Sequence, residues 1–92
     1  DQSEEESSMI DRSVDSLMLY PNPAQSEVTL EHATPITRIE VYTLSGQLVK
    51  QQTLETAINL VSLPISDLNQ GVYILTVYDQ DQKQQSRRLI KQ

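Results

Sequence analysis

The residues that could carry chemistry are few and isolated in the sequence. His32 is the single histidine and cysteine is absent, so no nucleophile–base pair can form around it. We therefore expect His32 to sit at the surface or to cap the strand end beside it. Asp79 and Asp81 resemble the start of a calcium loop, but the glycine and the twelfth-position glutamate of that loop are missing, which favours a polar hairpin turn. Gly46 and Gly71 stand alone and form no phosphate-binding loop. The sequence predicts neither an enzyme nor a site for a metal or cofactor.

The aromatic residues are all tyrosines, and they could in principle stack on nucleic-acid bases. They are spread over three expected strands, and the body of the chain lacks a basic stripe, so we expect packing at the edges of the core and no nucleic-acid partner. These residues are Tyr20, Tyr42, Tyr73 and Tyr78.

The charges are distributed unevenly along the chain. The formal net charge is −6, and residues 1–16 alone hold six acidic residues and one arginine. Four bases, in contrast, follow the last acidic residue, Asp81: Lys83, Arg87, Arg88 and Lys91. Such a basic strand end either protects a sheet edge from aggregation or forms a recognition patch for a partner. The pattern leaves both interpretations open.

Length and composition indicate one small domain with a thin core. The chain has 92 residues, 37% of them hydrophobic, and contains no Phe or Trp. No apolar stretch approaches the roughly 20 residues that span a bilayer, and no signal peptide opens the sequence. An exported protein would therefore be represented here by a fragment or by its mature part.

The acidic residues 1–16 favour a solvated linker over a packed segment, because low hydrophobicity and like charge oppose burial. A short helix is the alternative, since Ser3 and Glu6 could form a capping box and Ile10, Val14 and Leu17 have helical spacing. We assign residues 1–16 to an acidic linker and residues 17–92 to the folded domain.

From Leu17 onward, short alternating runs are separated by turn residues about every 8–12 positions, which is typical of an Ig-like antiparallel β-sandwich. Pro21 and Pro23 end the first run, and Ser45-Gly46 forms the clearest hairpin turn. The sequence thus predicts an all-β fold of about seven short strands. The expected strands are 17–20, 26–32, 36–44, 47–55, 57–63, 72–78 and 85–90.

Alternation on these strands predicts which side chains form the core. The segment 64–70 is expected to be an irregular crossing that places Ile65 and Leu68 under the sheet. The residues expected to be mostly buried are Val28, Leu30, Ile39, Val41, Leu48, Leu60, Leu68, Leu75 and Leu89.

Three segments, taken in order, resemble a known family. They are Leu19–Ala24, with Tyr20-Pro21-Asn22-Pro23; Ile39–Val49, with Gly46; and Leu68–Leu75, with Gly71 and Tyr73. Residues 17–92 are similar to the type A C-terminal sorting domains of the type IX (Por) secretion system. Thr43 replaces the Asp that is frequent in the family, and the tail has paired arginines in place of paired lysines.

The resemblance implies a β-sandwich that addresses a larger cargo, placed before residue 1, for export. A precursor would cross the periplasm, be recognised by the outer-membrane translocon, and reach the cell surface or the medium after a sortase-like protease removes the domain. The residues implied in translocon recognition are Gly71, Tyr73, Lys83, Arg87, Arg88, Leu89, Ile90 and Lys91.

An Ig-like adhesion or carbohydrate-binding module is the rival interpretation. Such a module would show an aromatic cluster or a metal site at one end of the sandwich, and the sequence offers neither. Exposed edge strands also predict that the isolated domain could form a homodimer.

Overall fold

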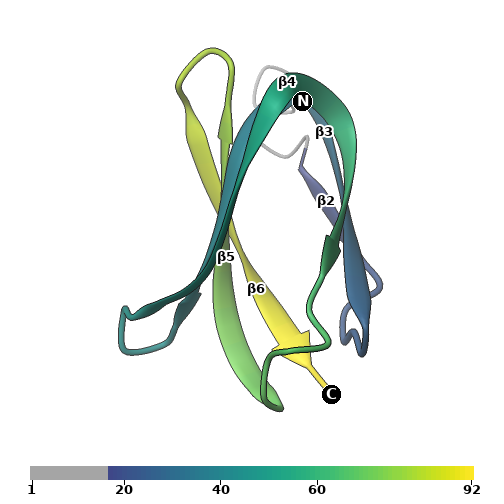
Figure 1. Ribbon diagram of the computed structural model, residues 1–92, viewed down its shortest axis with the longest axis vertical. Coiled ribbons are helices and arrows are strands. Elements are labelled where there is room, and N and C mark those ends of the chain that lie inside the picture. Colours follow the sequence, from purple (N-terminus) through teal and green to yellow (C-terminus); the bar gives the residue numbers. More distant parts are fainter. Residues whose placement is uncertain (1–16) are drawn as a thin grey trace, which may run out of the picture.

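The computed structural model describes residues 17–92, and this part of the chain is built from strands and turns without a helix (Figure 1). It therefore contains no helix that is long and apolar enough to cross a membrane. The strands are β2 (Met18–Tyr20), β3 (Glu27–Thr43), β4 (Leu48–Pro64), β5 (Gly71–Asp79) and β6 (Gln84–Lys91). The all-β class is confirmed. Residues 1–16 lie outside the described part, so their assignment to an acidic linker stays a prediction.

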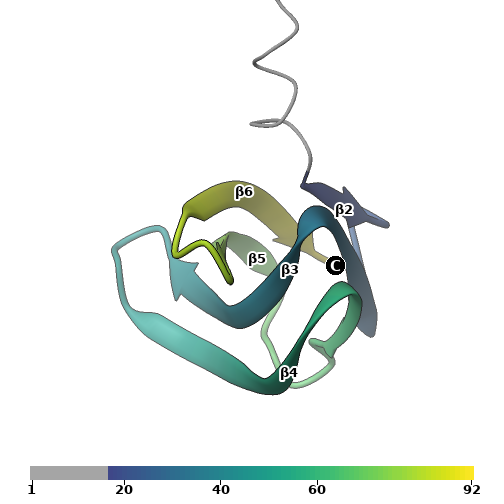
Figure 2. The same ribbon diagram turned by 90° about the horizontal axis from the view of Figure 1, so that it is seen from above.

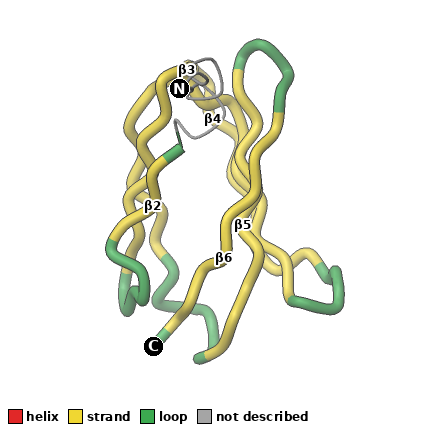
Figure 3. Tube along the Cα trace, turned by 180° about the vertical axis from the view of Figure 1, so that it is seen from behind, coloured by secondary structure: helices red, strands yellow, loops and turns green. Residues whose placement is uncertain are grey.

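Strand β3 organises the sheet, because it pairs with three other strands. Strand β4 pairs along nearly its whole length, β2 pairs with Thr29–Glu31, and β5 pairs with Ile36–Thr43. Strand β6 then pairs with β5, and all these pairings are antiparallel. The long strands curl over, so their two halves lie in opposing layers (Figures 1 and 2). The result is the expected sandwich, with the connecting loops at its two ends (Figure 3).

The predicted number of about seven strands is wrong, since the structure has five in its described part. Segments 26–32 and 36–44 belong to one strand, β3, and segments 47–55 and 57–63 belong to β4. Register shifts between Glu31 and Ile36 and between Ile36 and Arg38 let the strands bend without ending. Pro35 is accommodated at this bend, where its carbonyl accepts a hydrogen bond from the Gln80 amide at 3.0 Å.

Side chains supply the hydrogen bonds that the bent ladder loses. His32 Nδ1 accepts a hydrogen bond from the Thr34 amide at 2.9 Å, and Asn59 Nδ2 donates to the carbonyls of His32 and Ala33 at 2.9 Å each. The expected capping role of His32 is confirmed, because its side chain accepts a hydrogen bond from a backbone amide. Its expected position at the surface beside a strand end is wrong, because it lies inside β3 with 4% of its surface exposed.

The core lies between the two layers and is aliphatic apart from Tyr73. Six of the nine residues predicted to be mostly buried are fully inside: Val28, Leu30, Ile39, Val41, Leu75 and Leu89. In the 64–70 crossing, Ile65 is fully buried, as expected, and Leu68 is partly buried against the core. Because the core contains no Phe or Trp, its stability depends on close packing of branched side chains.

The prediction that Leu48 and Leu60 are buried is wrong, because the residues of β4 that face the core are not the expected ones. Leu60 pairs with Glu31 on the outer side and is 58% exposed, whereas Val61 and Leu63 pair with inward-facing residues of β3. Leu48 lies beside the β3–β4 turn and is 43% exposed. Strand β4 carries apolar residues at both phases, so alternation alone did not identify its buried side.

Two turns match the sequence interpretation. Gly46 adopts a φ of +97° between β3 and β4, and its amide donates to the Thr43 carbonyl at 2.9 Å. In the β5–β6 turn, Asp79 Oδ1 accepts hydrogen bonds from the amides of Asp81 and Lys83 at 2.9 and 3.1 Å. This carboxylate therefore organises the backbone of a polar turn, as Asp residues often do.

The phase of β4 can be tested with two leucines three residues apart. We expect Leu63→Ala to lower the free energy of unfolding by about 2–5 kcal/mol, because it leaves a cavity in the core. We expect Leu60→Ala, on the outer side, to change it by no more than about 0.5 kcal/mol. Urea denaturation of both variants measures the difference, and equal losses would contradict this assignment of the buried side.

Candidate recognition surface

Two segments at opposite ends of the domain sequence meet in the structure. Ala24 forms a parallel bridge with Lys91 at the end of β6. The Ala24 amide donates to the Ile90 carbonyl at 2.9 Å, and the Gln92 amide donates to the Ala24 carbonyl at 2.8 Å. The Tyr20-Pro21-Asn22-Pro23 motif and the basic tail, which the sequence presented as separate features, therefore form one unit.

Asn22 strengthens this contact through its side-chain amide. Its Nδ2 donates to the Arg88 carbonyl at 2.8 Å, and its Oδ1 accepts a hydrogen bond from the Ile90 amide at 3.0 Å. A carboxamide offers both a donor and an acceptor, so it can pair with a strand edge as a peptide group does. We call the contact made by Asn22 and Ala24 with residues 88–92 the β6 clamp.

The flanking prolines explain why the chain is available for this contact. Pro21 and Pro23 have no amide hydrogen, so the chain after Tyr20 cannot continue the full ladder with β3. It crosses instead to β6, whose outer side would otherwise be a free sheet edge over residues 88–92. The motif thus closes the sandwich beside the C-terminal strand.

The four tail bases differ in their surroundings. Arg88 and Lys83 are exposed, and the Lys83 amide takes part in the β5–β6 turn. Arg87 is half-buried; its guanidinium donates to the Ser86 carbonyl at 2.9 Å and approaches the Leu17 carbonyl at 3.4 Å. Lys91 Nζ donates to the Gln92 carbonyl at 2.9 Å. Within residues 17–92 the ion pairs are Arg38–Glu40 and Lys50–Asp67, so none of the tail bases is neutralised by a described acid.

The remaining predicted recognition residues divide into core and surface. Leu89 is fully buried, and Tyr73 is 9% exposed with its hydroxyl donating to the Asn69 carbonyl at 2.7 Å. These two side chains hold the hairpin in place and offer little to a partner. Ile90 is half-buried, and Gly71 opens β5 opposite Lys91 with a φ of +156°. Gly46 lies in the separate β3–β4 turn.

The outer face of the last hairpin contains apolar residues that the sequence interpretation did not assign to recognition. Ile74 pairs with Arg88, and Val72 pairs with Ile90, so these side chains share the face opposite the buried Leu75 and Leu89. Val72 is 38% exposed and Ile74 is half-buried. Arg88 therefore stands in a small apolar surface. The sequence did contain a sign of this surface, because the strand that begins at Gly71 carries apolar residues on both of its faces.

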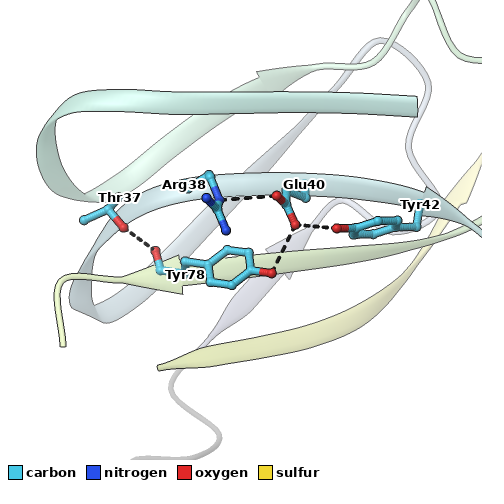
Figure 4. A network of polar contacts seen from close by, with 5 residues as sticks. All are labelled: Thr37, Arg38, Glu40, Tyr42 and Tyr78. Atoms are coloured by element: carbon cyan, nitrogen blue, oxygen red, sulfur yellow. Dashed lines mark hydrogen bonds and ion pairs between the residues drawn. The ribbon is translucent and has the colours of Figure 1, made fainter. Parts of the chain in front are cut away.

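A polar network covers the outer face farther along β3 and β5 (Figure 4). Glu40, only 7% exposed, accepts hydrogen bonds from the hydroxyls of Tyr42 and Tyr78, and the Arg38 guanidinium lies 4.2 Å from the centre of the Tyr78 ring. The hydrogen bond to the Glu40 carboxylate, with a smaller effect of burial, raises the pKa of Tyr42. The hydroxyls of Tyr42 and Tyr78 thus form hydrogen bonds within the domain.

The sequence matches the family model for the secretion system C-terminal sorting domain over residues 18–92. The chain belongs to this family. The resemblance noted from the three motifs is confirmed, and the sorting domain is the C-terminal secretion signal of type IX secretion cargo.

Among solved structures, the sorting domain is similar to part of PorZ, an essential bacterial surface component of the type IX secretion system of Porphyromonas gingivalis. The similarity has a TM-score of 0.62 at 20% sequence identity and covers 94% of this chain and 12% of the PorZ chain. It supports the fold assignment. The comparison with curated proteins gave no match.

The β6 clamp predicts a local effect for Asn22→Ala. Removing the carboxamide deletes two hydrogen bonds to the β6 edge, and we expect a loss of about 1 kcal/mol in unfolding free energy because the site is exposed to water. We also expect the Ile90 amide to exchange its hydrogen faster, which NMR can follow. Asn69→Ala, at another exposed asparagine, is the control and should leave this amide unchanged; equal exchange in both variants would contradict the clamp.

Proposed function

We propose that the translocon reads the sorting domain at a composite surface formed by β6, the outer face of β5 and the β6 clamp. The observation that supports this proposal is the clamp itself, which fixes the strand carrying Arg87, Arg88 and Lys91 against the segment 22–24. A strand held on both sides presents its outward side chains in one geometry. The signal is then a folded surface that includes the tail, and an unfolded tail peptide would bind poorly.

The composition of this surface favours an acidic partner with apolar contacts. Arg88 supplies an exposed charge that no described acid neutralises, and Val72, Ile74 and Ile90 supply apolar area beside it. Opposite charge accelerates the encounter of two proteins, whereas apolar burial supports the lifetime of the complex. Arg87 contributes less directly, because its guanidinium is directed toward the Leu17 and Ser86 carbonyls.

Export to the cell surface or secretion follows from the family. We propose the finer route: a larger cargo precedes residue 1, the precursor passes through the periplasm, and a sortase-like protease removes the sorting domain at the surface. The acidic residues 1–16 support the position of the cut, because their sequence lacks a strand pattern and extended segments fit protease clefts.

We further propose that the sorting domain has no catalytic activity. Its single histidine is buried in β3 with Nδ1 engaged by the Thr34 amide. Within residues 17–92, no three side chains of His, Cys, Asp or Glu are placed to hold a metal ion. The rival adhesion module gains no support from the described ends of the sandwich.

A homodimer of the isolated sorting domain would form through β4. This strand pairs only with β3 among the described strands, and it exposes Ile58 and Leu60 beside its free edge. We expect sedimentation velocity to show a dimer whose fraction rises with concentration, and Leu60→Lys to shift it to monomer, because a charge at a sheet edge opposes pairing. Leu44→Lys, at a 68% exposed turn residue, is the control and should dimerise normally. A monomer at all concentrations would contradict this proposal.

The function of the composite surface can be tested with a periplasmic reporter fused before this chain, in a host that has the type IX system. We expect Arg88→Glu to reduce surface delivery several-fold, because it reverses the charge at the centre of the surface. Circular dichroism and thermal unfolding should show a folded domain, since exposed substitutions change stability by about 0.5 kcal/mol or less.

Thr53→Glu combined with Thr56→Glu is the matched control for that variant. These two exposed residues of β4 give the same change in net charge on a strand that lies on the opposite side of the molecule from β6 (Figure 2). We expect normal delivery of this variant. Normal delivery of the folded Arg88→Glu fusion as well would show that the charge at β6 is not what the translocon reads.

A further inference from the structure

The turn between β3 and β4 projects from the sandwich and exposes aliphatic side chains (Figures 1 and 3). Leu44 is 68% exposed, Leu48 is 43% exposed and Val49 is 39% exposed. No charged side chain occurs in residues 41–49. Single exposed aliphatic residues are ordinary on a protein surface, whereas a group of them on a projecting turn indicates contact with an apolar partner or phase. We call residues 43–49 the β3–β4 tip.

Several polar groups of the β3–β4 tip are paired with one another. The Thr43 amide donates to the Gln47 carbonyl at 2.9 Å, and the Gly46 amide donates to the Thr43 carbonyl at 2.9 Å. The Thr43 hydroxyl accepts a hydrogen bond from the Gln47 amide at 3.1 Å and lies 2.9 Å from Ser45 Oγ. An unpaired polar group is costly to place in an apolar environment. This internal pairing therefore lowers the cost of moving the tip out of water.

The charged residues that flank the tip are also paired. Glu40, before the tip, lies 3.3 Å from Arg38 Nε, and Lys50, after the tip, lies 3.1 Å from an Asp67 carboxylate oxygen. A paired charge resists transfer to a low-dielectric surface less than an isolated charge does. The tip can thus approach an apolar phase without bringing a net charge with it.

The composition of the tip favours a lipid surface over a groove in another protein. Trp, Tyr and Arg dominate the binding energy of protein–protein contacts, whereas Leu and Val are under-represented there. The exposed large side chains of the tip are aliphatic, and the hydroxyls of Thr43 and Ser45 contact each other. Burial of aliphatic area is non-directional, so it needs no matching partner groups. A bilayer interface meets this requirement.

We propose that the β3–β4 tip inserts shallowly into the surface of a lipid bilayer, with Leu44, Leu48 and Val49 against the acyl chains and the sandwich outside. The lipid is zwitterionic, because the tip has no base that would attract an anionic headgroup. Binding is weak and reversible, since even one myristoyl chain binds membranes only marginally. The contact orients a domain that is already near a membrane, and it does not depend on the recognition surface at β6.

A paramagnetic lipid tests this insertion in the full chain. Phosphatidylcholine bicelles that contain a doxyl-labelled phosphatidylcholine are added to the isotope-labelled protein, and unlabelled bicelles serve as the reference. We expect the amide signals of residues 43–49 to lose intensity several-fold, whereas those of residues 58–62, in the other half of β4, keep it. The effect should persist in about 1 M NaCl, where the Debye length is about 3 Å, because the contact is apolar.

Serine substitutions at exposed leucines separate the tip from general surface hydrophobicity. We expect Leu44→Ser combined with Leu48→Ser to remove most of the broadening, and Leu44→Ser alone, at the most exposed position, to reduce it. Leu60→Ser, at a 58% exposed residue of β4, is the matched control and should keep the broadening. The amide spectrum of each variant shows whether it is folded.

Four results would each overturn the proposal. They are the absence of broadening in the unsubstituted chain, equal broadening in the Leu44→Ser and Leu60→Ser variants, loss of the effect at high salt, and broadening centred on the basic residues 83–88. The last two would assign membrane contact to the charges of β6, and the first would leave the tip to a protein partner.

Discussion

Strand β3 passes through both layers of the sandwich, and the position of every other strand follows from its bend. Its first half pairs with β2, its second half pairs with β5, and β4 follows it along the other edge. A bend in a strand leaves backbone groups without ladder partners, which is costly unless other groups replace them. His32 and Asn59 supply those partners at the bend. A small domain without disulfides thereby obtains two layers from few strands.

A contact between distant segments closes the other edge of the sandwich, where residues 22–24 hold the end of β6. This contact joins chain segments separated by 66 residues or more. It places the motif and the basic tail in one surface, so a secretion signal that looks linear in sequence depends on the tertiary fold. Substitutions in either segment are expected to affect the other, because every hydrogen bond of the clamp joins a group of one segment to a group of the other.

The tail of the sorting domain serves two physical purposes at once. Leu89 completes the core, while Arg88 and Ile90 face outward on the same strand. Deleting the tail therefore removes the fold and the surface together, and only outward substitutions separate the two effects.

The all-β class, the turns at Gly46 and Asp79, and most of the core could be predicted from the sequence alone, because alternation and turn chemistry are local properties. The family also followed from local motifs, and the match over residues 18–92 confirms it. The tertiary structure was needed to show that β3 runs unbroken through Pro35, that β4 buries Val61 and Leu63 in place of Leu60, and that Asn22 pairs with β6. The bend depends on side-chain partners from another strand, the phase of β4 depends on its register with β3, and the clamp is a contact between distant segments. Local patterns carry no information on such pairings, so these features required the fold.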